Sequence, residues 1–287
     1  MPKKKSVKPV APSLFPLKND FVFKLVFGDQ RRIKLLTPFL QAVLDIPAEE
    51  YEDVTIIDPN VKKEYRKDKA GILDVKINTK SGRVIDVEIQ VEPEIPLIER
   101  LMFYQAKMIT EQIGEGNDYD VIKPVINIVI TDFTVVIPNS QAYHHRFRFY
   151  DAENEIELTD LKEIHTLELS KLPQKSDTTE LFDWLMLIKA RNREEYEMIA
   201  KKKPVFEKVV AVVKQLSADE QARMEYDKHE LWRMDYAAAM RNAARKGMEK
   251  GMEKGKIEIA RVMKAKGYSV SDIADLTGLS EQEIKQL

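Results

Sequence analysis

Hydrophobic residues follow two different periods along the first 175 residues. Helical spacing, with apolar residues three or four apart, covers residues 21–44 and 97–112. Shorter runs alternate apolar with polar residues, or are apolar throughout, and these predict strands. The predicted strands are 54–57, 73–78, 84–91, 124–131, 143–150 and 164–169. Because residues 124–131 are apolar on both faces, they predict a central strand. This order of elements predicts an α/β fold, in which a mixed sheet is flanked by helices.

The sequence after residue 175 has a helical pattern, and the whole chain is predicted to consist of several parts. We expect a disordered basic tail at 1–13, the α/β core at 14–175 and a helical extension at 176–240. A basic helix with glycines four apart follows at 241–256, and 257–287 resembles a small helix-turn-helix. The core of this last part is predicted from its apolar residues, Ile273, Ala274, Leu276, Leu279 and Ile284.

Two capping boxes predict where helices of the C-terminal part begin. Ser217 with Glu220, and Ser280 with Glu283, have the required spacing. The second box opens a helix whose first turn also carries Glu281, and acidic residues there oppose contact with DNA. We therefore expect the last part to serve protein contact or assembly, and a homo-oligomer formed through the helical C-terminal part is a further expectation.

Composition excludes several classes of site. The chain has 46 basic and 48 acidic residues, so any affinity for nucleic acid must come from local clusters of positive charge. The lack of cysteine excludes a disulfide framework, a thiolate zinc site and a cysteine nucleophile. No run of about 18 apolar residues is present to span a membrane, and the basic start lacks the apolar segment of a signal peptide. We expect a cytoplasmic protein without a membrane partner.

A hairpin at residues 71–91 carries the most informative pattern. Gly82 ends a three-residue loop and suits the left-handed conformation that such a loop requires. This loop sets Ile77 opposite Ile85 and Val75 opposite Val87, so that one face is entirely apolar. A two-residue turn would mix polar with apolar residues on both faces, and we reject it. On the other face, Asp74 is then expected directly opposite Glu88.

Two carboxylates that face each other across a strand pair repel, and a divalent cation would relieve that repulsion. Their Cβ atoms would lie roughly 5 Å apart. Mg²⁺ prefers oxygen ligands at about 2.1 Å and retains water molecules for chemistry. In the alternative interpretation, Lys76 or solvent on an exposed face relieves the repulsion, and the pair is inert.

The combined pattern resembles the recombination-promoting nucleases, a family of PD-(D/E)XK nuclease transposases. The hairpin resembles their active site, because Asp74 precedes a Glu-x-Gln motif, Glu88 to Gln90. Further similarity extends over about 14–240 and includes Lys18–Lys24, Arg100–Tyr104, Gly116–Tyr119, Pro124–Ile130, Tyr143–Arg146 and Leu167–Lys171. The resemblance implies a restriction-endonuclease-like core that hydrolyses phosphodiester bonds of DNA and is associated with recombination or mobile DNA.

The resemblance also implies the role of each site residue. Asp74 and Glu88 would hold Mg²⁺ (or Mn²⁺), and the main-chain carbonyl of Ile89 would add a third oxygen. Gln90 stands where the wider superfamily has a lysine, so it can orient water but supplies no positive charge. Two alternatives stay open: a catalytically degenerate nuclease fold that binds DNA or assembles, and a nuclease toxin or defence effector.

Other candidates are accessory. Asp20 could join the site, or could act as an N-cap or first-turn acid of the first helix. Tyr104 could face the site or pack in the core. A basic loop just before the hairpin could contact phosphates or be solvated, and its residues are Lys62, Lys63, Arg66, Lys67 and Lys69.

Overall fold

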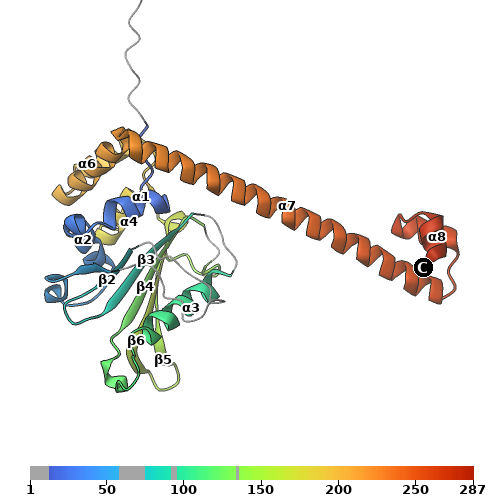
Figure 1. Cartoon of the computed structure of the whole chain (residues 1–287), viewed down its shortest axis with the longest axis horizontal. Coiled ribbons are helices and arrows are strands. Elements are labelled where there is room, and N and C mark those ends of the chain that lie inside the picture. Colours follow the sequence, from blue (N-terminus) through green and yellow to red (C-terminus); the bar gives the residue numbers. More distant parts are fainter. Residues whose placement is uncertain (1–12, 58–74, 92–95, 134–135) are drawn as a thin grey trace, which may run out of the picture. The chain divides into compact units, whose positions relative to one another are not determined.

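A mixed sheet forms the centre of the protein. The computed structural model describes residues 13–57, 75–91, 96–133 and 136–287. Within these residues the sheet has six strands in the order β1-β2-β3-β4-β6-β5 (Figure 1). The parallel pairs are β3 with β4 and β4 with β6, and the other neighbours are antiparallel. The strands are β1 Thr55–Ile57, β2 Val75–Asn78, β3 Val84–Gln90, β4 Val125–Thr131, β5 His144–Asp151 and β6 Ile156–Glu168.

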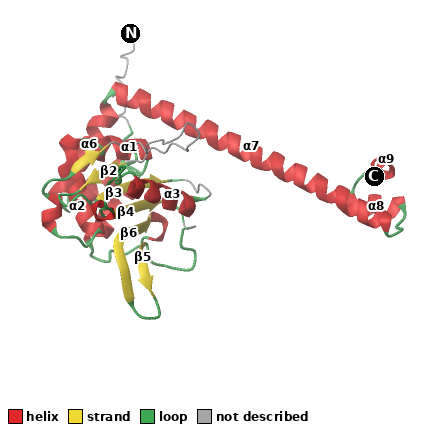
Figure 2. Ribbon diagram, turned by 60° about the horizontal axis from the view of Figure 1, so that its bottom comes forward, coloured by secondary structure: helices red, strands yellow, loops and turns green. Residues whose placement is uncertain are grey.

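Helices cover both faces of this sheet, as the α/β class requires. On one face the apolar side chains of β2, β3 and β4 pack into a continuous core with several helices. These helices are α1 Asp20–Phe27, α2 Ile33–Val43, α4 Glu180–Lys189, α5 Arg193–Ala200 and α6 Pro204–Ala218. The opposite face is covered by α3, Leu97–Thr110, whose apolar residues pack against Val84, Val125 and Val129 (Figures 1 and 2).

The expected fold class is therefore confirmed, including the position of β4. Every residue of β4 is buried, because the strand lies between β3 and β6 with a helical layer on each side. The strand predicted at 164–169 begins earlier than expected, at Ile156. Its first half pairs with β5 in a ribbon that extends beyond the rest of the sheet (Figure 2). This half is largely exposed, and its apolar residues Ile156, Leu158 and Leu161 do not keep one two-residue alternation, so the pattern did not predict it.

The segment before α1 is fixed by side chains from distant helices. The main-chain amide of Phe15 donates to Ser217 Oγ at 2.8 Å, and that of Leu17 donates to the Tyr196 hydroxyl at 2.7 Å. Ser217 is buried within α6, so the first predicted capping box is wrong. Helix α7, Glu220–Ala265, is instead capped by Asp219, whose side chain accepts from the amide of Ala222 at 2.7 Å.

The described residues form two compact units, residues 13–226 and 227–287. The second contains most of α7, together with α8 Val270–Thr277 and α9 Glu281–Gln286. Its small core is formed by Ala260, Ile273 and Ile284, with Ala274 and Leu279 packed against it. Leu276, which we expected in this core, is 73% exposed. The predicted capping box of Ser280 and Glu283 is confirmed.

No helix among the described residues combines the length and the apolar character that crossing a membrane requires.

Candidate functional site

The hairpin of β2 and β3 has the predicted register. Val75 pairs with Val87 and Ile77 pairs with Ile85. The amide of Thr79 donates to the carbonyl of Arg83 at 3.0 Å, which closes the three-residue loop. Gly82 adopts the expected left-handed conformation, with φ of +87°. Asp74 lies outside the described residues, and so do the basic-loop residues Lys62, Lys63, Arg66, Lys67 and Lys69.

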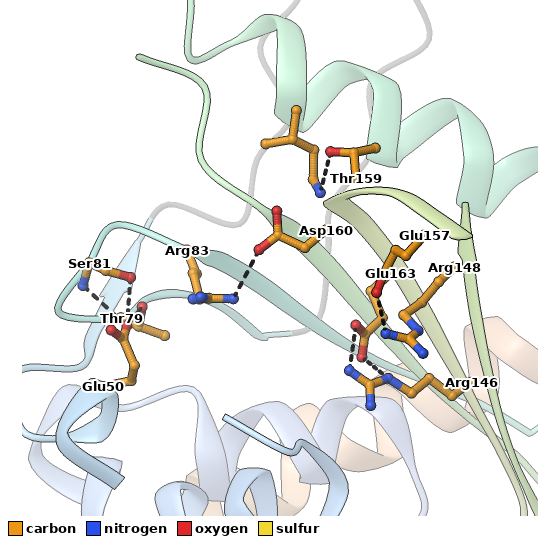
Figure 3. A network of polar contacts seen from close by, with 11 residues as sticks. Glu50, Thr79, Ser81, Arg83, Arg146, Arg148, Glu157, Thr159, Asp160 and Glu163 are labelled. Carbon is orange, nitrogen blue, oxygen red and sulfur yellow. Dashed lines mark hydrogen bonds and ion pairs between the residues drawn. The ribbon is translucent and has the colours of Figure 1, made fainter. Parts of the chain in front are cut away.

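The loop of this hairpin is also held from outside. The Glu50 carboxylate accepts from the hydroxyls of Ser81 and Thr79, at 2.6 and 2.7 Å (Figure 3). These hydrogen bonds lower the pKa of Glu50 below its usual value, the Ser81 contribution being the largest. Directly after the loop, Arg83 Nη1 lies 3.9 Å from the Asp160 carboxylate of β6 (Figure 3). Glu50 was not predicted from the sequence, because no local pattern links it to Thr79 and Ser81, which lie 29 and 31 positions later.

The polar face of the hairpin is buried under α3. Asp86 is 1% exposed and Glu88 8% exposed. The described strands therefore do not present the exposed, solvated acidic face of the alternative interpretation. Buried ionised groups require specific partners.

Two polar residues of this face, Asp86 and Lys76, have partners that lie away from the C-terminal end of β3. The Asp86 carboxylate accepts a hydrogen bond of 3.0 Å from the side-chain amide of Asn127 on β4. Lys76 Nζ lies 3.1 Å from the carboxylate of Glu111, the residue that follows α3. This ion pair joins the hairpin to the C-terminal end of the helix that covers it.

At the other end of α3, Arg100 joins Glu88 to Gln90. Its Nη2 donates to Glu88 Oε1 and, at 2.9 Å, to Gln90 Oε1. The Arg100 side chain is 27% exposed and that of Glu88 is 11% exposed. Arg100 was not among the site residues predicted from the sequence. The only available signal was its place in the Arg100–Tyr104 motif, because the spacing from Gln90 alone does not predict that the helix turns back over the strand.

Apolar packing fixes the position of α3. Leu97 and Leu101 pack against Val129 of β4. Further along the helix, Tyr104 packs with Met108 against Val84 and Val125. Tyr104 therefore contributes to the core, which is one of the two roles considered for it. The following residue, Gln105, is buried and donates to the carbonyl of Glu163 at 3.1 Å, so it has a structural role.

The carboxyl ends of the parallel strands meet at one edge of the sheet beside Gln90. Gln90 pairs with Thr131, and Thr131 pairs with Glu168. The amide of Asp132 donates to the carbonyl of Gln90 at 3.1 Å, and its carboxylate pairs with Lys18. Ligand sites of open α/β sheets lie at such edges.

Lys18 precedes α1, so the start of this helix lies near the same edge. Asn19 caps α1, and its side chain accepts from the amide of Val22 at 3.1 Å. Asp20 is the first residue of the helix and supplies a first-turn acid.

His144 and His145 point to opposite sides of β5, as their adjacency predicts. A ring nitrogen of His144 lies 2.8 Å from His165, and one of His145 lies 2.7 Å from the Ser140 hydroxyl. The two imidazoles cannot bind one ion together.

The described part of the site has oxygen donors that suit a cation. Glu88 and Gln90 direct one oxygen each to the same positively charged nitrogen of Arg100. Hard oxygen donors of this kind are what Mg²⁺ prefers. No cluster of three potential metal-binding side chains occurs within the described residues, from which Asp74 is left out.

Comparison with known proteins gives one result. The chain matches the family model of the PD-(D/E)XK nuclease family transposases over residues 17–243. Neither the curated proteins nor the solved structures provide a match. The matched segment includes the sheet, α3 and the Glu88–Gln90 motif, so it covers the whole candidate site. The chain therefore belongs to the PD-(D/E)XK nuclease family transposases, with the restriction-endonuclease-like α/β fold that its sheet displays.

Proposed function

We propose that the protein is a metal-dependent DNA endonuclease that hydrolyses phosphodiester bonds and acts in recombination or on mobile DNA. The observation that carries this proposal is the register of the hairpin, described as far as the pairing of Val75 with Val87. One further residue along each strand, this register would set Asp74 opposite Glu88 on the polar face. Family membership supports nuclease activity. PD-(D/E)XK nucleases generally use divalent metals, which supports the proposed dependence on metal.

In this proposal Asp74 and Glu88 hold Mg²⁺, for which Mn²⁺ can substitute, together with the carbonyl oxygen of Ile89. The cation would supply an activated water molecule and would stabilise charge that develops on the phosphate. Gln90 would orient the attacking water through its amide, since it lies beside Glu88 at the end of β3. Asp20, at the start of α1 near the same edge, remains an accessory candidate.

DNA is the partner that this chemistry requires. We propose that the basic loop that precedes the hairpin in the sequence, from Lys62 to Lys69, contacts the phosphate backbone of DNA. We further propose that the helical C-terminal part joins two copies of the chain.

One observation favours a second function, a degenerate nuclease fold that binds DNA or assembles without cleavage. Gln90 replaces the superfamily lysine, so the motif itself lacks a positive charge near the scissile phosphate. This alternative predicts salt-dependent DNA binding that does not change in Asp74→Ala. A nuclease toxin or defence effector would share the proposed chemistry and differ only in its biological setting.

The proposed function predicts cleavage of plasmid DNA that depends on both carboxylates. Purified full-length protein should convert supercoiled plasmid to cut forms in Mg²⁺ or Mn²⁺, and EDTA should abolish the activity. Asp74→Asn and Glu88→Gln should each lower the rate by at least about 100-fold, because each removes a negative charge from a metal ligand. Gel electrophoresis of the products over time measures the rate.

Glu111→Gln is the matched control, because it neutralises a carboxylate at the C-terminal end of α3 without changing the proposed ligands. It should cleave at a rate near that of the wild type. A wild-type protein that leaves plasmid intact in every divalent metal tested would refute the proposal. Cleavage that persists in both variants would assign the activity to other residues or to a contaminant.

A further inference from the structure

Hydrolysis of a phosphodiester needs positive charge near the phosphate, and Gln90 supplies none. Charge that develops in the transition state is stabilised by donors already fixed in place around it. In the structure, a guanidinium stands beside Gln90. Arg100 Nη2 lies 2.9 Å from Gln90 Oε1 and also contacts Glu88.

We propose that Arg100 is a catalytic residue of this site, which contacts the scissile phosphate and supplies the positive charge that the Glu-x-Gln motif lacks. This inference rests on the proposed nuclease function. In the wider superfamily a lysine of the motif provides this charge. Here the charge would come from α3, outside the hairpin. Arginine suits this role, because its planar fork of five donors serves several oxygen atoms at once and retains its charge.

The geometry keeps Arg100 at the site before any substrate binds. It occupies the first turn of α3, where Leu97 and Leu101 pack on β4 on either side of it. Its side chain is more exposed than the Glu88 carboxylate beneath it, 27% against 11%. Arg100 therefore reaches from α3 to the end of β3 while part of its side chain stays exposed, on the side from which a phosphodiester must approach.

The competing explanation is that Arg100 only ties α3 to the sheet. The chain contains a matched ion pair for comparison, Lys76 with Glu111, which ties the other end of α3 to the same hairpin. That pair is also well buried, with side chains 8% and 15% exposed. If Arg100 were purely structural, breaking either pair would have similar consequences.

The test compares Arg100→Gln, Arg100→Lys and the control Glu111→Gln in the full-length chain. Turnover of a duplex oligonucleotide in saturating Mg²⁺ should fall by about 100-fold in Arg100→Gln, mainly in kcat. Arg100→Lys should keep part of the rate, and added guanidinium ion should restore part of the rate of Arg100→Gln. Calorimetry should show that Mn²⁺ still binds to Arg100→Gln. Glu111→Gln should keep the wild-type kcat.

A second measurement tests the inference without cleavage. In Ca²⁺, the affinity for the same duplex is measured by fluorescence anisotropy at several salt concentrations. Loss of one phosphate contact in Arg100→Gln should reduce the slope of log Kd against the logarithm of the salt concentration by about one. Glu111→Gln should leave this slope unchanged. This result alone would support the contact even if the wild type proved inactive, which would refute only the proposed function. An unchanged salt dependence in Arg100→Gln, or a loss of kcat that guanidinium does not restore, would overturn the inference.

Discussion

The buried charged residues of the sheet are each matched to specific partners. On the face opposite α3, the Glu163 carboxylate accepts two hydrogen bonds from Arg146, at 2.7 and 2.9 Å, and contacts His165. The other ring nitrogen of His165 lies 2.8 Å from His144. Burial alone would raise the pKa of Glu163, but the hydrogen bonds from His165 and Arg146 lower it to about 2. Burial, reinforced by the neighbouring histidines and Arg146, lowers the pKa of His144 to about 4.

These two shifts predict that the protein loses stability progressively in acid. Between about pH 6.5 and pH 4 the unfolded chain binds a proton at residue 144 that the folded chain does not, so stability falls as the pH falls. From about pH 4.5 to pH 2 the same holds for Glu163, whose folded pKa is also depressed. Urea unfolding at half-unit pH intervals measures the effect. In His144→Gln the decline between pH 6.5 and 4.5 should be shallower than in the wild type.

Two probes serve as the control for this experiment. Tryptophan fluorescence, to which the buried Trp184 of the main core and the exposed Trp232 both contribute, should change together with far-UV circular dichroism. The same slope in His144→Gln and in the wild type would contradict the assignment of this decline to His144.

At the scale of elements, helix α7 combines great length with weak local propensity. It contains Gly247, Gly251 and Gly255, each of which costs about 0.8–1 kcal/mol relative to alanine in a helix interior. A Cβ atom added at any of the three would meet no atom within 4 Å among the described residues. The glycines are therefore not required by close packing within the described chain.

Replacing all three glycines with alanine should stabilise this part of α7 by about 2–3 kcal/mol. Hydrogen exchange of the amides at residues 247–255 measures this directly, and protection should rise by at least about 10-fold. The matched control is Ala243→Gly, which should lower the protection of the same segment. Protection that stays the same or falls in the triple variant would contradict the claim that the glycines weaken α7 through their low helix propensity. It would indicate that another chain contacts the glycines.

Some elements could be predicted from the sequence and others could not. The hairpin could be predicted because its alternation allows only one register that separates apolar from polar residues. The start of β6 at Ile156 could not, since the two-residue alternation breaks between Leu158 and Leu161, where the pairing with β5 also shifts register. Ser217 has the spacing of a capping box, but its hydroxyl accepts from the amide of Phe15, about 200 residues earlier, a contact that local spacing cannot reveal.

At the scale of the whole molecule, the site combines features that the sequence predicts with features that only tertiary packing creates. Glu88 and Gln90 could be placed from the pattern of one strand. Arg100 could not, because its position depends on how the helix packs back over β3 and β4. The proposed site depends on one pairing, in which Asp74 and Glu88 share a divalent cation.

A crystal structure of the full-length protein soaked in Mn²⁺ tests that claim most directly. If the two carboxylates share a cation, an anomalous peak will lie between them, with oxygen atoms of Asp74 and Glu88 both about 2.1 Å from the ion. A structure in which no ion binds there, or in which Asp74 and Glu88 project from opposite faces of the sheet, would contradict it.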